Sequence, residues 1–224
     1  MIKEQGTNTK VTEAIQKISN EYETNPVEGV LSHKMKKHLI DGNDVIINKE
    51  TPEQKVEEFE FMPGDVIGLD IFVSTGEGKP KEGDYRTTVY KRELDTQYNL
   101  KIKSARSFFS EVNKKYPTLP FAIRAFEDST AAKVGVKECI AHDLLTPYPV
   151  LVEKAGELVA QFKVTIAVLQ KSTVILAGDL AIPLERFDTE KKIKDQELVS
   201  LIDSELWKKE DKKKAVKKEE EKKQ

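Results

Sequence analysis

The sequence predicts an α+β protein in which strands early and late in the chain flank a central helical insertion. Residues 66–74 and 158–169 are rich in β-branched and aromatic side chains, which is typical of buried strands. Between them, from Ser104 onward, the apolar spacing becomes helical and places Phe108, Val112 and Tyr116 on one stripe. With 224 residues the chain is long enough for one substantial domain.

The N-terminal part predicts a helix, a short strand and a charged loop. Val11 and Ile15 begin a helical pattern that Thr9 precedes as N-cap, and Pro26 ends it. Residues 45–47 predict a short strand. Residues 48–60 are charged and contain a proline, so we expect a loop there.

Further strands are predicted on both sides of the insertion. Residues 86–90 are expected to be the return strand of a hairpin with 66–74. After a proline pair, residues 150–152, 158–169 and 174–177 predict an antiparallel meander. The insertion should bury a second stripe that comprises Ala131, Val134, Cys139 and Leu144.

These patterns divide the chain into four parts: 1–90, the first part of the main domain; 91–146, the helical insertion; 147–190, the closing strands; and 191–224, a weak helix with a Lys/Glu-rich tail whose composition is that of a disordered segment.

Composition excludes several classes of protein. No apolar run approaches the roughly 20 residues of a spanning helix, and the N-terminus lacks the apolar core of a signal peptide. Cys139 is the sole cysteine, so no internal disulfide can form. Its position among apolar residues at helical spacing predicts a core side chain rather than a nucleophile.

The tail is the candidate nucleic-acid contact. Residues 208–224 contain nine Lys against five acidic residues, whereas the rest of the chain has a net charge of −6. Lysines attract phosphates, but the acidic run at 219–221 weakens the field, and a purely solubilising role stays open. The candidate contacts are Lys208, Lys209, Lys212, Lys213, Lys214, Lys217 and Lys218.

Metal-site patterns are weak. His33 and His38 are five residues apart, a spacing that does not form an i, i+4 pair on one helix face. His142 stands alone and is better explained by capping or packing.

Asp70 is a stronger candidate, because an acid within an apolar strand must be hydrogen-bonded or point into a polar site. The Gly-rich segment 74–78 does not lead into a helix, so it does not predict a phosphate-binding loop.

Lys163, like Asp70, is a charged residue on a strand that is otherwise apolar. It lies at the start of an apolar strand, where an ammonium is costly to bury unless a carboxylate accepts it. We therefore expect Lys163 either to lie beside an acid or to point to solvent.

Several segments resemble a known family. They include the run 28–42 (EGVLSHKMKKHLIDG), Gly68 to Gly78 (GLDIFVSTGEG), Arg86 to Arg92 (RTTVYKR), the Pro-Tyr-Pro at 147–149 and the Ala-Gln-Phe-Lys ending at Lys163. In this order they resemble the C-terminal half of a pita-bread (creatinase/aminopeptidase) fold with an antiparallel sheet and a winged-helix-like insertion. The chain is most similar to the proliferation-associated, ErbB-receptor-binding branch, relatives of type 2 methionine aminopeptidase.

The resemblance implies a degenerate metal site. Active relatives use two Asp, one His and two Glu, and the two Asp would come from the preceding half of the fold, which this chain does not contain. The His position falls at or beside Ser32, with His33 displaced by one residue. The first Glu position is Asp70 and the second is Lys163. A cationic Lys repels a metal ion, so the resemblance implies no cofactor and no catalytic residue.

The function implied by the resemblance is binding rather than catalysis, with the helical insertion and the basic tail as the contact elements. The expected partners are ribosomes and structured RNA, with signalling or transcription proteins also possible and no membrane, in growth and translation control in the cytoplasm and in the nucleus or nucleolus. Two alternatives stay open: a metal-dependent methionine aminopeptidase, and a truncated, non-functional half-domain whose sheet would expose an edge.

Overall fold

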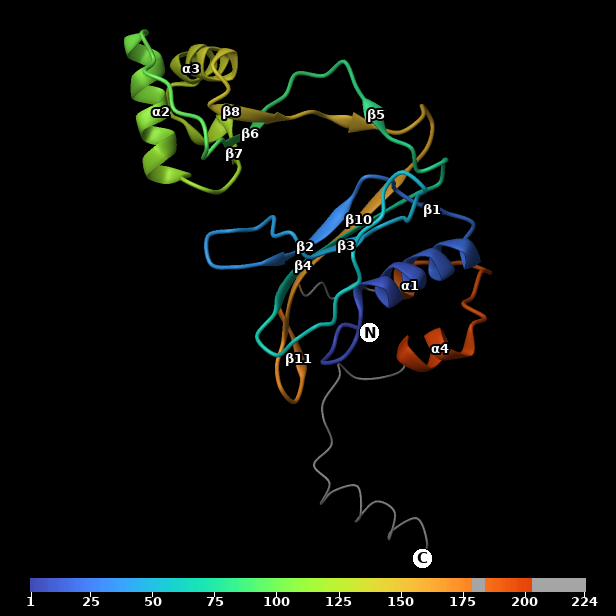
Figure 1. Cartoon of the computed structure of the whole chain (residues 1–224). Helices are drawn as coiled ribbons and strands as arrows, with labels where there is room; N and C mark the ends of the chain where they lie inside the picture. Colours follow the sequence, from blue (N-terminus) through green and yellow to red (C-terminus); the bar gives the residue numbers. More distant parts are fainter. Residues whose placement is uncertain (179–183, 203–224) are drawn as a thin grey trace, which may run out of the picture. The chain divides into compact units, whose positions relative to one another are not determined.

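The chain forms two compact units in the computed structural model, which describes residues 1–178 and 184–202 (Figure 1). The first, here called the sheet unit, comprises residues 1–36 and 41–79 and the described residues from Glu153 onward. The second, the helical unit, comprises residues 37–40 and 80–152. Each has its own hydrophobic core.

The sheet unit is built on an antiparallel sheet. Its described strands follow the order β11-β10-β4-β2-β3, and short β1 pairs with one end of β4. The strands are β1 (Asn25–Pro26), β2 (Leu31–Met35), β3 (Val45–Ile47), β4 (Val66–Ser74), β10 (Val159–Val168) and β11 (Thr173–Ala177). Two helices, α1 (Asn8–Glu21) and α4 (Gln196–Ile202), and the 3-10 turn η2 (Leu184–Arg186) complete the unit.

Alternation along β4 separates an apolar face from a polar one. Ile67 points into a core with Val11 and Ile15 of α1, together with Ile46 and Phe61. Since successive side chains on a strand point to opposite faces, Gly68 and Asp70 lie on the other face of the sheet.

The predicted N-cap of α1 was wrong by two residues. The helix begins at Asn8, and Thr7 is its N-cap residue, without a side-chain capping bond. Asn8 is fully buried, its amide donates to the carbonyls of Val45 and Glu57, and its Oδ1 accepts from the Phe59 N–H. These contacts with distant segments fix the start of the helix at Asn8, before the position that Thr9 predicted as N-cap.

The helical unit packs two helices and a small sheet around aromatic side chains. Its elements are β5 (Lys81–Glu82), β6 (Val89–Arg92), α2 (Lys103–Lys115), β7 (Phe121–Ala122), the 3-10 turn η1 (Ile123–Ala125), α3 (Ser129–Ala141), β8 (Leu145–Tyr148) and β9 (Leu151–Val152). The core contains Phe108, Phe121 and Phe126, with ring centroids 4.9–6.2 Å apart. Cys139 is fully buried in this core, as predicted, and burial raises the pKa of its thiol to about 12.

Two structural predictions for this region were wrong. The strand predicted at 86–90 forms as β6 (Val89–Arg92), but it pairs with β7 and β8 rather than returning along β4. Val134 is exposed, because the buried stripe of α3 runs through Ala132, Val136 and Cys139. The β10–β11 hairpin of the predicted meander is confirmed, whereas β9 pairs with β5 in the helical unit.

Within the described residues, no helix is long and apolar enough to cross a membrane.

Candidate functional site

Asp70 and Lys163 face each other across the two central strands of the sheet unit. In the antiparallel pair of β4 and β10, Asp70 lies directly opposite Lys163. The Lys163 Nζ is 2.5 Å from Asp70 Oδ2, and Gln161 Nε2 donates to Asp70 Oδ1 at 2.7 Å. Both oxygens of the carboxylate therefore have a donor from β10.

The two charged side chains differ in exposure. The Asp70 side chain is 17% exposed and that of Lys163 is 66% exposed. Both alternatives expected for Lys163 are thus realised at once, since the ammonium lies beside an acid and also reaches solvent. Because Lys163 stays largely hydrated, the pair avoids most of the desolvation cost of a buried ion pair.

Ser32 supports the backbone of Asp70. Its side chain is buried, and its hydroxyl accepts from the Asp70 N–H at 2.8 Å and donates to the Asp70 carbonyl at 3.2 Å. The main-chain pairing of β2 with β4 begins one residue later, at His33 opposite Gly68. The Ser32 hydroxyl thus satisfies backbone groups that the ladder leaves unpaired.

His33 is directed to a main-chain carbonyl. Its register with Gly68 places it on the same face of the sheet as Asp70, but its Nδ1 lies 3.0 Å from the carbonyl oxygen of Gly42. The segment 31–35 is a strand, so the helical spacing considered for His33 and His38 does not apply; His38 lies outside any strand or helix. His142, in the helical unit, stacks on Tyr98 at 3.7 Å, consistent with packing.

The arrangement does not suit a divalent metal ion. The Asp70 carboxylate is already bonded to an ammonium and an amide, and a Lys163 cation repels a second cation. In the part of the chain that the structure describes, no group of three or more His, Cys, Asp or Glu side chains could hold a metal.

Segment 74–78 is held by carboxylates rather than shaped for phosphate. Glu153 accepts from the Ser74 hydroxyl and the Gly78 N–H, and Thr75 donates to Glu157. Acidic side chains at the site would repel a phosphate.

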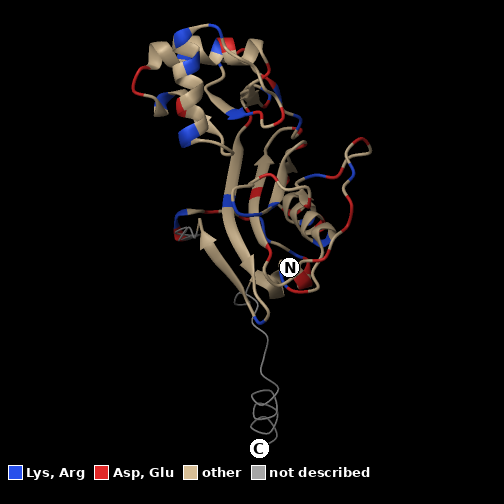
Figure 2. Ribbon diagram, turned by 60° about the vertical axis from the view of Figure 1, so that its left-hand side comes forward, with Lys and Arg blue, Asp and Glu red and all other residues tan. Residues whose placement is uncertain are grey.

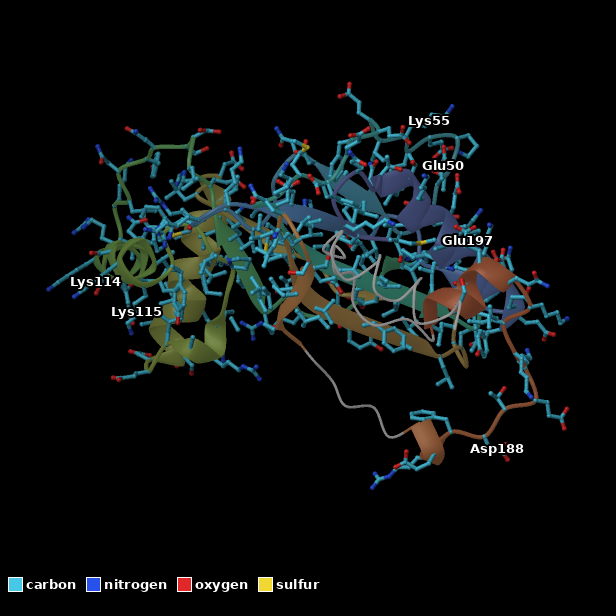
Figure 3. All side chains as sticks on the ribbon, turned by 90° about the horizontal axis from the view of Figure 1, so that it is seen from below. Glu50, Lys55, Lys114, Lys115, Asp188 and Glu197 are labelled. Atoms are coloured by element: carbon cyan, nitrogen blue, oxygen red, sulfur yellow. The ribbon has the colours of Figure 1, made fainter. Side chains whose placement is uncertain are left out.

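Basic side chains are in excess on the helical unit. Residues 37–40 and 80–152 contain 13 basic and nine acidic residues, a net charge of +4. Figure 2 shows them along its helices, and Lys114 and Lys115 end α2 (Figure 3). Exposed basic side chains of this unit without an ion pair to an acidic described residue include Lys101, Lys103, Lys114, Arg124, Lys133 and Lys137. The seven tail lysines proposed from the sequence, Lys208 to Lys218, lie outside the described residues.

The fold defines an α+β protein of the pita-bread class, in which an internal ion pair lies at Asp70 and Lys163. A search of solved structures supports the class: the structure of a thermophilic Arx1 matches with a TM-score of 0.80 and 32% identity, over 90% of this chain and 54% of that one. The predicted fold class is thereby confirmed.

Curated relatives place the chain more narrowly. It is 49% identical to the ErbB-3 binding protein 1 of Solanum tuberosum, over 72% of this chain and 42% of the relative. It is 41% identical to proliferation-associated protein A of Dictyostelium discoideum, over 92% and 53%, and 39% identical to the curved DNA-binding protein of Schizosaccharomyces pombe, over 96% and 57%. No family model matches the chain.

These matches confirm the resemblance to the proliferation-associated, ErbB-receptor-binding proteins. Similarity to aminopeptidases is weaker, at 32% identity to methionine aminopeptidase 2 of Podospora anserina over 71% of this chain. The chain spans about half the length of these curated relatives.

Proposed function

We propose that this chain is part of a protein that has lost aminopeptidase activity and acts by binding RNA, including ribosomal RNA, and protein partners in growth and translation control. The observation that carries the proposal is the ion pair of Lys163 and Asp70, at the positions that the family resemblance assigns to two metal-binding carboxylates. An enzyme of this kind needs anionic ligands there, whereas Lys163 supplies a cation.

Charge distribution supports RNA as a ligand. The helical unit and residues 208–224 each carry a net charge of +4, and the remaining residues carry −10. Phosphate contacts favour the two basic parts, so we propose that the helical insertion and the tail lysines contact RNA. Such a protein would act in the cytoplasm and in the nucleus or nucleolus.

The names of two relatives also describe binding rather than catalysis. The potato relative is named for ErbB-3 and the fission-yeast relative for curved DNA. We propose a nucleic acid and a protein as the two kinds of ligand for this chain too, with RNA in place of DNA.

The decisive experiment is a peptidase assay. We expect no release of methionine from Met-Ala-Ser by this chain, or by a longer protein that contains it, with Co²⁺ or Mn²⁺ added. An active type 2 methionine aminopeptidase serves as the positive control. Turnover above a blank that a chelator abolishes would overturn the proposal and favour the aminopeptidase alternative.

A further inference from the structure

A pocket of about 380 Å³ lies between α1 and the segment that follows β3, on the sheet unit and away from Asp70. One side is a stripe of α1 formed by Thr9, Thr12, Glu13, Gln16 and Lys17. These residues recur at three- and four-residue intervals and so share one helix face. The other side is formed by Ile47, Glu50 and Val56, and Figure 3 labels Glu50 on this segment beside α1.

The floor of the pocket is apolar, with its polar groups already satisfied. Ile47 is 2% exposed, and the Thr12 hydroxyl donates to the Ile47 carbonyl at 2.7 Å. Val56 is half-buried opposite α1. A ligand therefore meets aliphatic surface at the bottom and gains little from a polar group placed there.

The rim presents carboxylates whose charge is not neutralised. Neither the Glu13 carboxylate nor the Glu50 carboxylate has an ion pair or hydrogen bond with a described residue. Lys17, the cation of the lining, is 3.3 Å from Asp195. The backbone N–H of Leu198 foremost, and also Lys17, hold the pKa of Asp195 below its usual value, so this partner stays ionised at neutral pH.

The surrounding charge strengthens this preference for cations. Residues 41–79, which include one wall of the pocket, contain three basic and ten acidic residues. Their field attracts a cationic group toward the rim.

We propose that this pocket binds an arginine side chain of a basic peptide segment on a protein partner. The aliphatic stem of arginine suits a floor of Ile47 and Val56, and its planar guanidinium carries five donors that can meet carboxylates from more than one direction. A volume of about 380 Å³ is at the small end of ligand pockets, roughly 300–1,000 Å³, which fits one long side chain rather than a large ligand. None of its lining residues belongs to the helical unit or to residues 208–224, the parts for which RNA binding is proposed.

The test is a titration of the isotope-labelled chain with the peptide acetyl-Gly-Arg-Gly-amide, followed by the methyl signals of Ile47 and Val56. We expect saturable shifts with a dissociation constant on the order of 1 mM, typical of a ligand with one anchoring side chain. A peptide with citrulline in place of arginine has the same shape without the charge and should bind at least fivefold more weakly.

Matched variants locate the site. Glu13→Gln and Glu50→Gln should each weaken arginine-peptide binding about two- to fivefold, in the range of an exposed ion pair. Glu53→Gln, which removes the same charge from the same segment outside the pocket lining, should leave it unchanged. Thermal melts confirm that each variant is folded.

Three results would overturn the proposal: no shift of either methyl signal at 10 mM peptide, equal binding of the citrulline peptide, or equal loss in all three variants. Tighter binding of free spermidine than of the arginine peptide would identify a polyamine site instead of a peptide site.

Discussion

At the scale of single residues, the identity of residue 163 decides the chemistry of the two central strands. A carboxylate opposite Asp70 would form a site that attracts cations. The Lys163 ammonium instead supplies the positive charge beside Asp70 from within the chain. The Gln161 side-chain amide donates a hydrogen bond to the other oxygen of the Asp70 carboxylate. Both oxygens of the Asp70 carboxylate are thus bonded by side chains of β10.

Lys163→Glu should therefore destabilise the chain at pH 7. It places two carboxylates directly opposite each other, and like charges in that position cost about 0.2–1 kcal/mol. Urea unfolding at low and high salt measures the effect, which salt should reduce. Lys163→Met is the control: Asp70 keeps Gln161 and its exposure to water, so a smaller loss is expected. Equal losses for Glu and Met would mean that repulsion between the two opposed carboxylates contributes nothing.

Glu153 offers a residue-scale test that depends on pH. The backbone N–H of Lys154 foremost, then the Ser74 hydroxyl and the Gly78 N–H, lower the pKa of its carboxyl below the usual value. A group with a lowered pKa in the folded state contributes stability above its unfolded pKa and loses it as pH falls through the folded value. Glu153→Gln should thus lower the melting temperature at pH 7 and have little effect near pH 3.

The control for this test is Glu53→Gln, on an exposed segment without those contacts. It should change the melting temperature little at either pH. A pH-independent effect of Glu153→Gln would show that packing, rather than ionisation, is responsible.

At the scale of elements, sequence patterns predicted strands and helices better than their partners. Lys163 on an apolar strand signalled a need for an acid, but Asp70 is 93 positions away, and only the register of β4 with β10 selects it. The strand at 86–90 was recognisable from its residues, yet the nearest strand in sequence was the wrong partner, because the insertion supplies β7 and β8. Nothing local could reveal the pocket beside α1, since its two walls come from separate segments.

The packing of α2 against α3 predicts that Gly135→Ala destabilises the chain, whereas helix propensity alone predicts that it stabilises the chain. Gly135 lies within α3, where alanine normally stabilises a helix by about 1 kcal/mol relative to glycine. A Cβ at this position would lie 2.5–2.6 Å from three Phe108 atoms. Overpacking of this kind costs about 1–3 kcal/mol, so Gly135→Ala should lower the free energy of unfolding. In a Phe108→Ala background, which removes two of the three contacted atoms, Gly135→Ala should cost less, and a stabilised single variant would contradict the packing of this core.

At the scale of the whole molecule, charge is segregated between parts of the chain. The helical unit and the 208–224 tail are each +4, whereas the remaining residues total −10. A uniform distribution would give a net charge of −2 with little preference for phosphates. Under the proposed function, this segregation would direct RNA to the two basic parts and leave an acidic surface for other partners.

The salt dependence of RNA binding should therefore divide between the two basic parts. Each phosphate neutralised by a lysine adds about 0.7–0.9 to the slope of log affinity against log salt. Deleting residues 208–224 should reduce the slope by about 2–4, because the excess of lysines there is four and acidic residues compete. Replacing Lys101, Lys103, Lys133 and Lys137 by Gln should reduce it by up to about 3. The same change at Lys10, Lys36, Lys55 and Lys79 of the sheet unit is the matched control and should leave the slope unchanged.

Filter binding of ribosomes and of a structured RNA at several salt concentrations measures all four proteins. Equal slopes for the parent, the tail deletion and the helical-unit variant would mean that neither basic part contacts phosphate, and that any RNA binding belongs to another surface.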